Sequence, residues 1–215
     1  MEKSEQVKRE LLNSLKAITE ILQSCQAKYR ILGSVNAVAY TKRVFRRIED
    51  IDVVLDLKDK ECVFNGLKNR GFQVIKKKLG IFYWYESEKK DHLKITFFLI
   101  GEFTKDHFLY KYGLFRLFIQ SDYIKPVQYN LNGIEFTGVP IASVVDGIRQ
   151  TSFNPKRTID RDILAKEMEL FNKKMKNKLY IRLGGIKLPL FYRFFSYLCN
   201  VYGGISEDKN KYKLF

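Results

Sequence analysis

The chain has 215 residues, of which 46% are hydrophobic, so it is long enough to bury a sizeable core. Its 39 lysines and arginines outnumber its 24 acidic residues, and the net charge of +15 favours partners such as nucleotides, RNA, DNA or an anionic membrane surface. A lysine-rich composition without a binding role is the alternative explanation. The three cysteines, Cys25, Cys62 and Cys199, lack paired spacing, so they predict neither a disulfide framework nor a zinc site and favour a reducing cytoplasm.

The N-terminal segment is charged and then amphipathic, which is not the pattern of a secretory signal peptide. Apolar residues recur there at helical spacing: Val7, Leu11, Leu15, Ile18, Leu22 and Cys25. We therefore expect a first helix that packs one side on a sheet. Near the other end, the apolar stretch 188–205 contains Pro189, Arg193 and Gly203-Gly204, which argues against a stable membrane span.

The following elements alternate between strand and helix patterns. Residues 29–32 predict a short strand that ends at Gly33, and residues 35–43 predict the next helix. An acidic strand is expected at 51–57, followed by a helix at 58–69 that ends at Gly71 in a left-handed cap. Further strands are expected at 72–76, 81–86, 93–100, 127–131 and 134–137, the last two joined by a hairpin turn at Asn132-Gly133.

Beyond Pro140 the pattern becomes helical, because Ile141, Val144, Val145 and Ile148 recur at helix spacing. The sequence thus predicts an α+β fold. Residues 1–139 form a mixed, twisted β-sheet with helices, and residues 140–215 form a helical C-terminal region packed on it. Two aromatic and basic stretches, 108–118 and 180–202, leave core packing, base stacking or contact with a partner or membrane surface open.

A group of small and acidic residues suits a magnesium nucleotide. Side chains at i and i+2 of a strand share a face, so Asp50 and Asp52 converge while the residues between them enter the core. Two such carboxylates suit Mg²⁺, and Gly33-Ser34 opens a helix whose free amides favour phosphate. A solvated acidic strand end in an unrelated α/β domain is the alternative. Asp56 continues the same face but lies roughly 13 Å beyond Asp52, so we expect it either to be solvated at the strand end or to cap a helix.

The run Leu32-Gly33-Ser34 followed by Asp50-Ile51-Asp52-Val53 resembles the signature of the nucleotidyltransferase superfamily, which has the polymerase-β-like fold. It is most similar to the minimal and AbiEii-like branches, with a slightly longer spacer. The resemblance implies that Asp50 and Asp52 are catalytic ligands of Mg²⁺ or Mn²⁺. It also implies that an NTP is the substrate and that Gly33 and Ser34 grip its phosphates.

The resemblance also implies a third carboxylate on a neighbouring strand, and this chain departs from that pattern. The strand expected at 93–100 has Lys94 or Thr96 where the acid would stand. Such an acid often activates the attacking hydroxyl as a general base. A replacement is expected from Glu86 on the preceding strand or from Glu102 just after this one.

Cations surround the predicted site. Residues 154–163 resemble a basic-then-acidic segment of AbiEii-like proteins, and many relatives have a lysine on the preceding helix where this chain has Arg149. The phosphate contacts that this resemblance implies are Lys156, Arg157, Arg161 and Arg149. Asp160 or Asp162 then orients the cations, although both acids also fit a plain helix N-terminus paired with Arg157 and Lys166. Arg46 and Arg47, just before the acidic strand, either hold triphosphate or only screen the acids.

Three functions remain open from the sequence. The first is an Mg-dependent nucleotidyltransferase that moves NMP from an NTP to a hydroxyl or phosphate acceptor. The second is a catalytically impaired relative that binds nucleotide or RNA such as tRNA, or acts with a protein partner in a toxin–antitoxin pair. The third is a non-enzymatic basic RNA module, whose binding would depend steeply on salt. The acceptor stays open among an antibiotic, a tRNA end, a protein side chain and a small sugar.

Overall fold

The computed structural model describes residues 2–79, 82–101, 107–112, 115–151, 156–170, 180–183 and 186–189. Its helices are α1 (Glu2–Ser24), α2 (Ser34–Thr41), α3 (Lys60–Asn69), α4 (Ile141–Gln150), α5 (Lys156–Ile163) and α6 (Ala165–Leu170), with 3₁₀ turns η1 (Leu57–Asp59) and η2 (Ser121–Ile124). Its strands are β1 (Tyr29–Ile31), β2 (Asp50–Asp56), β3 (Gln73–Leu79), β4 (Phe82–Glu88), β5 (Lys94–Ile100), β6 (His107–Tyr112), β7 (Phe115–Gln120), β8 (Val127–Leu131), β9 (Ile134–Gly138), β10 (Tyr180–Leu183) and β11 (Ile186–Pro189). The elements predicted before residue 101 are therefore present within a few residues of their expected ends.

The main sheet has seven strands in the order β3-β4-β5-β2-β1-β9-β8. Its central strand, β2, pairs with β5 in parallel and with β1 antiparallel. The inward side chains Ile51, Val53, Ile95 and Phe97 are fully buried, as expected for strands in the middle of a sheet. The acidic strand and the strand after it are thus neighbours in one sheet, which confirms the prediction.

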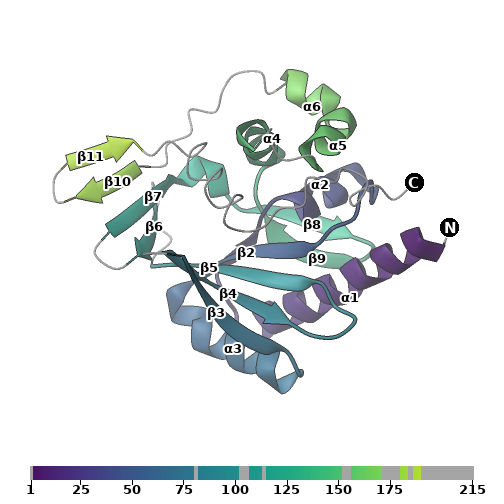
Figure 1. Ribbon diagram of the computed structural model, residues 1–215, viewed down its shortest axis with the longest axis horizontal. Helices are drawn as coiled ribbons and strands as arrows, with labels where there is room; N and C mark the ends of the chain where they lie inside the picture. Colours follow the sequence, from purple (N-terminus) through teal and green to yellow (C-terminus); the bar gives the residue numbers. More distant parts are fainter. Residues whose placement is uncertain are drawn as a thin grey trace.

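Helices cover the main sheet on both sides. Figure 1 shows α1 and α3 together on one side of the sheet and α4, α5 and α6 on the opposite side. The predicted apolar face of α1 is buried: Val7, Leu11, Leu15, Ile18 and Leu22. From α3, the ring of Phe64 meets those of Tyr85 and Phe97, with centroids 4.9 and 5.4 Å away. Among the described helices, none combines the length and apolar character that crossing a bilayer requires.

The turn residues behave as the sequence predicts. Asn132 and Gly133 both have positive φ angles, 52° and 83°, which is the geometry of the tight turn between β8 and β9. Gly71 has a φ of 80° after α3, as a left-handed cap requires. The carboxylate of Asp56 accepts a hydrogen bond from the Lys58 amide at 3.1 Å and caps η1, so its expected capping role is confirmed.

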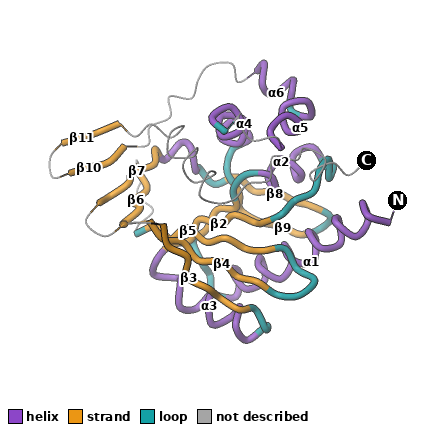
Figure 2. Tube along the Cα trace, in the orientation of Figure 1, coloured by secondary structure: helices purple, strands orange, loops and turns teal. Residues whose placement is uncertain are grey.

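The region after Pro140 begins with α4, α5 and α6, which agrees with the predicted fold class. The structure adds a hairpin that the sequence pattern did not indicate, because β10 and β11 have only four residues each and β10 pairs with the distant β7. Figure 2 shows the resulting second sheet, in the order β11-β10-β7-β6. The side chains of the two aromatic and basic stretches and the residues beyond 189 lie outside the described part of the chain. The stacking role of these two stretches and the domain boundary between residues 139 and 140 therefore stay predictions.

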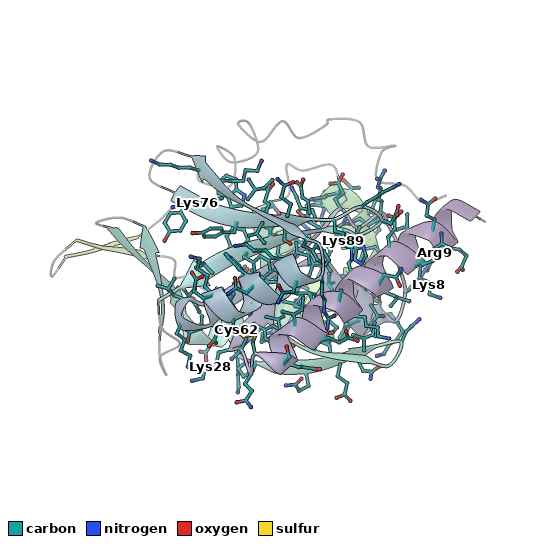
Figure 3. All side chains as sticks on the ribbon, turned by 90° about the horizontal axis from the view of Figure 1, so that it is seen from below. Lys8, Arg9, Lys28, Cys62, Lys76 and Lys89 are labelled. Atoms are coloured by element: carbon teal, nitrogen blue, oxygen red, sulfur yellow. A yellow bond between two sulfur atoms is a disulfide. The ribbon has the colours of Figure 1, made fainter. Side chains whose placement is uncertain are left out.

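A disulfide joins Cys25, just after α1, to Cys62 in α3, with their Cα atoms 5.9 Å apart. Seen from below, Figure 3 shows Cys62 on α3, which runs beside α1. The prediction that the cysteines form no disulfide was wrong. It rested on sequence spacing, whereas helix packing brings together two residues that are 37 positions apart. The predicted cytoplasmic location loses this support and stays untested.

Candidate active site

The two aspartates of β2 lie on the face of the main sheet that points away from α1 and α3. Asp50 and Asp52 are half-buried and alternate with the buried Ile51 and Val53. The charge of Asp50 acts on the carboxyl group of Asp52, so the two acids lie close enough to interact. The predicted convergence of the pair therefore agrees with the structure.

The Gly33 turn lies directly against this pair. The Leu32 amide donates to the Asp52 carbonyl at 2.8 Å, and α2 begins one residue after Gly33. Gly33 has a φ of 64°, a conformation that suits glycine. A Cβ atom at this position would lie 3.8 Å from Oδ2 of Asp52, so the backbone turn and the carboxylate face each other. The N-terminus of α2 thus opens next to the acids, as the sequence predicts.

The carboxyl group of Asp52 is hard to ionise in this arrangement. Burial and the neighbouring charge of Asp50 raise its pKa from 3.8 to about 7, although Lys156, Arg157 and Lys94 oppose the rise. The nearby cations therefore do not fully offset the effect of burial and of the Asp50 charge on the pKa of Asp52. Among the described residues, no group of three His, Cys, Asp or Glu side chains is placed to hold a metal ion. The donor set is a carboxylate pair, which fits Mg²⁺ completed by phosphate and water oxygens.

Thr96 stands beside Asp52 where the resemblance implies a third carboxylate. The parallel register of β2 and β5 places Asp50 next to Lys94 and Asp52 next to Thr96. Paired residues on neighbouring strands share a face, and Thr96 is buried. The structure therefore has a threonine, and not a third carboxylate, next to Asp52.

Glu86 continues this row on the next strand, because β4 pairs Glu86 with Thr96. Its Oε1 accepts a hydrogen bond from Nε1 of Trp84 at 2.9 Å and lies 3.5 Å from Nζ of Lys94. Two strand spacings separate the backbones of Glu86 and Asp52 by roughly 10 Å. Glu102, the other replacement predicted from the sequence, lies outside the described residues.

Two cations of α5 face the acids. Nζ of Lys156 lies 4.0 Å from Oε2 of Glu49, and the charges of Lys156 and Arg157 both act on Asp52. Burial and the neighbouring Arg157 lower the pKa of Lys156, while Asp50 opposes this effect. The structure therefore brings these two predicted phosphate contacts to the carboxylate pair from a segment about 100 residues further along the chain.

Arg46 is placed differently from its prediction, because its side chain is buried among protein groups. Its Nε donates to Oδ1 of Asp160 at 2.5 Å, its Nη2 donates to Oδ2 at 3.3 Å and also to the hydroxyl of Ser34, and its Nη1 donates to the Arg47 carbonyl at 2.9 Å. Nη1 of Arg157 donates to the same Asp160 carboxylate at 2.7 Å. Arg46 thus contacts two candidate site residues and is not open to solvent.

Asp160 is held as a carboxylate inside the protein. Burial alone would raise its pKa, but the charges and hydrogen bonds of Arg46 and Arg157 outweigh burial and hold it below its usual value. The pairing with Arg157 matches the helix N-terminus interpretation, and Arg157 also donates to Oγ1 of Thr151 at 2.9 Å. The pairing with Arg46 spans 114 residues, and no local sequence signal indicated it.

The remaining candidates lie around the site. Arg47 and Arg161 are exposed, and Nε of Arg161 donates to the Arg157 carbonyl at 3.3 Å. Nη2 of Arg149 donates to the Met168 carbonyl and so connects α4 to α6. Their role as phosphate contacts stays a prediction.

The comparison with solved structures agrees with this fold. No family model and no curated protein sequence matches the chain. Among solved structures, it is similar to the lincosamide antibiotic adenylyltransferase LnuA bound to lincomycin, with 14% identity, a TM-score of 0.50, and coverage of 62% of this chain and 82% of that one.

Two structures of ANT(2″)-Ia are also similar. The solution structure of this antibiotic-resistance factor has 13% identity and a TM-score of 0.55, covering 74% of this chain and 88% of that one. The crystal structure in complex with adenylyl-2″-tobramycin has 12% identity and a TM-score of 0.51, covering 74% and 91%. The Gly33 turn, the Asp50 and Asp52 pair and these similarities together identify the fold of this chain as the nucleotidyltransferase fold.

Proposed function

We propose that this protein is an Mg-dependent nucleotidyltransferase that moves NMP from an NTP to a hydroxyl or phosphate acceptor. One observation carries the proposal: the Gly33 turn lies against the Asp52 carboxylate while Lys156 and Arg157 act on the same group from α5. A helix N-terminus, a carboxylate pair and two cations are the groups that hold a metal-bound triphosphate. The shared fold supports the same class of reaction.

In this proposal each group of site residues binds a different part of the metal-bound nucleotide. Asp50 and Asp52 would hold Mg²⁺, or Mn²⁺ in its place, and the bound ion would stabilise negative charge on the transferring phosphoryl group. The backbone at Gly33 and Ser34 faces the phosphates at the start of α2. Lys156 and Arg157 neutralise phosphate oxygens from the opposite side.

A hydroxyl acceptor must lose a proton as its oxygen attacks the α-phosphorus atom and the bond from that atom to the leaving pyrophosphate breaks. Thr96 has no usefully ionisable group for that proton. Glu86 has a carboxylate on the same face, one strand further from the pair, and we assign it as the general base. Trp84 and Lys94 hold this carboxylate in place through the contacts described above.

The solved relatives suggest which acceptor to test first. LnuA was crystallised with lincomycin and ANT(2″)-Ia with adenylyl-2″-tobramycin. A hydroxyl of a small antibiotic-like molecule, with ATP as donor, is therefore our first candidate. The basic charge of the chain makes the end of an RNA such as tRNA the second.

One observation favours a different function. Thr96 occupies the place next to Asp52 that an acid would fill, and among the described residues no three His, Cys, Asp or Glu side chains are placed together to hold a metal ion. We therefore keep a catalytically impaired relative as the second candidate. Such a protein binds nucleotide or RNA without transferring NMP, alone or with a protein partner as in a toxin–antitoxin pair.

The test is incubation of the purified protein with each labelled NTP and Mg²⁺, in separate reactions with lincosamides, aminoglycosides and total RNA. Transfer of label that disappears with EDTA and in Asp50→Asn supports the enzyme. Binding of Mg·NTP without transfer to any acceptor supports the impaired relative. Salt-sensitive RNA binding without any nucleotide binding contradicts the enzyme.

A further inference from the structure

A chain of buried polar contacts joins the Gly33 turn to α5. We name it the Arg46 bridge and define it as Ser34, Arg46, Asp160 and Arg157, in the order of their contacts. Arg46 and Asp160 at its centre are only 1% and 2% exposed. Ser34 is the first residue of α2, and Arg157 is a cation that acts on Asp52. Each end of the bridge therefore holds a residue of the candidate nucleotide site.

Stability does not explain this arrangement well. Removing two charges from water costs so much that replacing a buried ion pair by apolar residues of similar volume is often neutral or stabilising. The second partner of Asp160 provides a better reason. Its carboxylate accepts hydrogen bonds from both Arg46 and Arg157, so it fixes the guanidinium of Arg157 relative to that of Arg46. Arg46 in turn contacts Ser34, the residue after Gly33.

The identity of Arg46 also fits a positioning role. Its Nε, Nη1 and Nη2 atoms donate to groups on three segments: Asp160 on α5, the Arg47 carbonyl before β2, and the Ser34 hydroxyl on α2. A planar guanidinium holds these acceptors in one fixed geometry. A lysine has a single nitrogen atom on a flexible stem and does not reproduce it.

We propose that Arg46 and Asp160 are positioning residues that hold the two sides of the nucleotide site at a fixed spacing. One side is the Gly33-Ser34 turn, and the other is the cation pair Lys156 and Arg157 on α5. The triphosphate then contacts both sides of the site only while the contacts of the Arg46 bridge are intact. This inference rests on the proposed nucleotide site and replaces the predicted phosphate contact of Arg46 with an indirect role.

The experiment uses the paired variant Arg46→Met/Asp160→Leu, which removes both buried charges together and leaves no uncompensated ion. Isothermal titration with Mg·ATP, Mg·CTP, Mg·GTP and Mg·UTP measures affinity, and thermal unfolding checks the fold. We expect a melting temperature near that of the wild type but nucleotide binding that is weaker by about tenfold or more, as for loss of one charge-assisted hydrogen bond.

The control is Arg70→Met/Glu20→Leu, which removes an exposed pair whose Nη1 and Oε2 atoms are 2.6 Å apart on the α1 and α3 side. It should leave nucleotide affinity unchanged. If the buried paired variant does not fold, Arg46→Lys keeps the charge but loses the three-way geometry, and it should show the same direction of loss.

Two failures are distinguishable. A folded bridge variant that binds the nucleotides as tightly as the wild type overturns the positioning role alone. A wild-type protein that binds none of the four Mg·NTPs overturns the proposed function, and with it the site that the bridge would position.

Discussion

In the candidate site, two neighbouring carboxylates repel each other and the surrounding cations offset that repulsion only in part. Asp50 and Asp52 share a face beneath the Gly33 turn, and Lys94, Lys156 and Arg157 only partly offset their repulsion. Sites that bind ligands commonly keep such unfavourable arrangements at a cost in stability.

The first prediction concerns the metal ligands. Asp50→Asn and Asp52→Asn each remove one charged oxygen ligand, so each should reduce Mg²⁺-dependent NTP binding, and the double variant should abolish it. Isothermal titration with Mg·ATP measures the effect, with circular dichroism to confirm an intact fold. Unchanged binding by the double variant would refute the assignment.

The second prediction concerns pH. Because burial and Asp50 raise the pKa of Asp52 to about 7, the folded state holds this proton more tightly than the unfolded chain, where the pKa is near 3.8. Without metal, its contribution to the free energy of unfolding is therefore full below about pH 4 and is lost as the pH rises to about 7.

Asp52→Asn removes that loss and should melt several degrees above the wild type at pH 8, since about 1 kcal/mol corresponds to roughly 2–4 °C in a chain of this size. Thermal melts from pH 4 to 8 in EDTA measure the difference. The exposed Asp162→Asn is the control and should follow the wild type. A difference that does not change with pH would contradict the prediction.

The third prediction separates activity from impairment. Thr96→Asp adds a carboxylate next to Asp52, so it should strengthen Mg²⁺ binding and create or raise transfer activity. Glu86→Gln should lower kcat and leave the KM for NTP nearly unchanged, while Glu88→Gln, exposed on the same strand, should do neither.

The double variant Thr96→Asp/Glu86→Gln should recover the activity that Glu86→Gln loses. A fast wild type in which Glu86→Gln is neutral would mean that another acid, such as Glu102, takes the proton. If neither the wild type nor Thr96→Asp transfers NMP, the result favours the catalytically impaired relative.

Among the secondary-structure elements, the turn between β1 and α2 sets the distance between the amides at the start of α2 and the two acids. Gly33→Ala finds ordinary van der Waals space near Asp52, but the φ of 64° strains any residue with a Cβ atom. We expect a loss of about 1 kcal/mol in the free energy of unfolding and weaker Mg·NTP binding as the turn shifts.

Gly71→Ala is the matched control. Gly71 also has a positive φ, 80°, with open space around it, but it ends α3 on the opposite side of the sheet. Urea unfolding should show a similar loss of stability, and titration should show normal nucleotide binding. Equal binding losses in both variants would mean that stability, and not the turn geometry, controls affinity.

Elements whose signals are local were predictable from the sequence. The Gly33 turn, the Asn132-Gly133 hairpin and the apolar stripe of α1 depend on neighbours within a few residues, and all three are present. The pairing of Arg46 with Asp160 and the β10–β11 hairpin depend on residues that are distant in sequence. Periodicity and turn chemistry contain no information about such contacts, so the sequence left Arg46 open between holding triphosphate and screening the acids.

Across the molecule as a whole, the Cys25–Cys62 disulfide links the end of α1 to α3 on one side of the main sheet. Closing a chain segment of this length restricts the unfolded state, so Cys25→Ser, Cys62→Ser or reduction should lower the free energy of unfolding by about 2–4 kcal/mol. Thermal melts with and without reductant measure the change. Cys199→Ser leaves the disulfide intact and should respond to reductant as the wild type does.

The same disulfide also makes a covalent ring of the chain between Cys25 and Cys62. That ring contains β1, α2 and β2, and therefore the glycine turn and both aspartates. A single cut by trypsin at Arg43 or Arg47, both exposed, opens the ring without releasing a fragment. The nicked protein should run as one band without reductant and as two with it. The two strands beside the proposed metal and phosphate sites, β1 and β2, would then remain tethered to each other after the backbone between them has been broken.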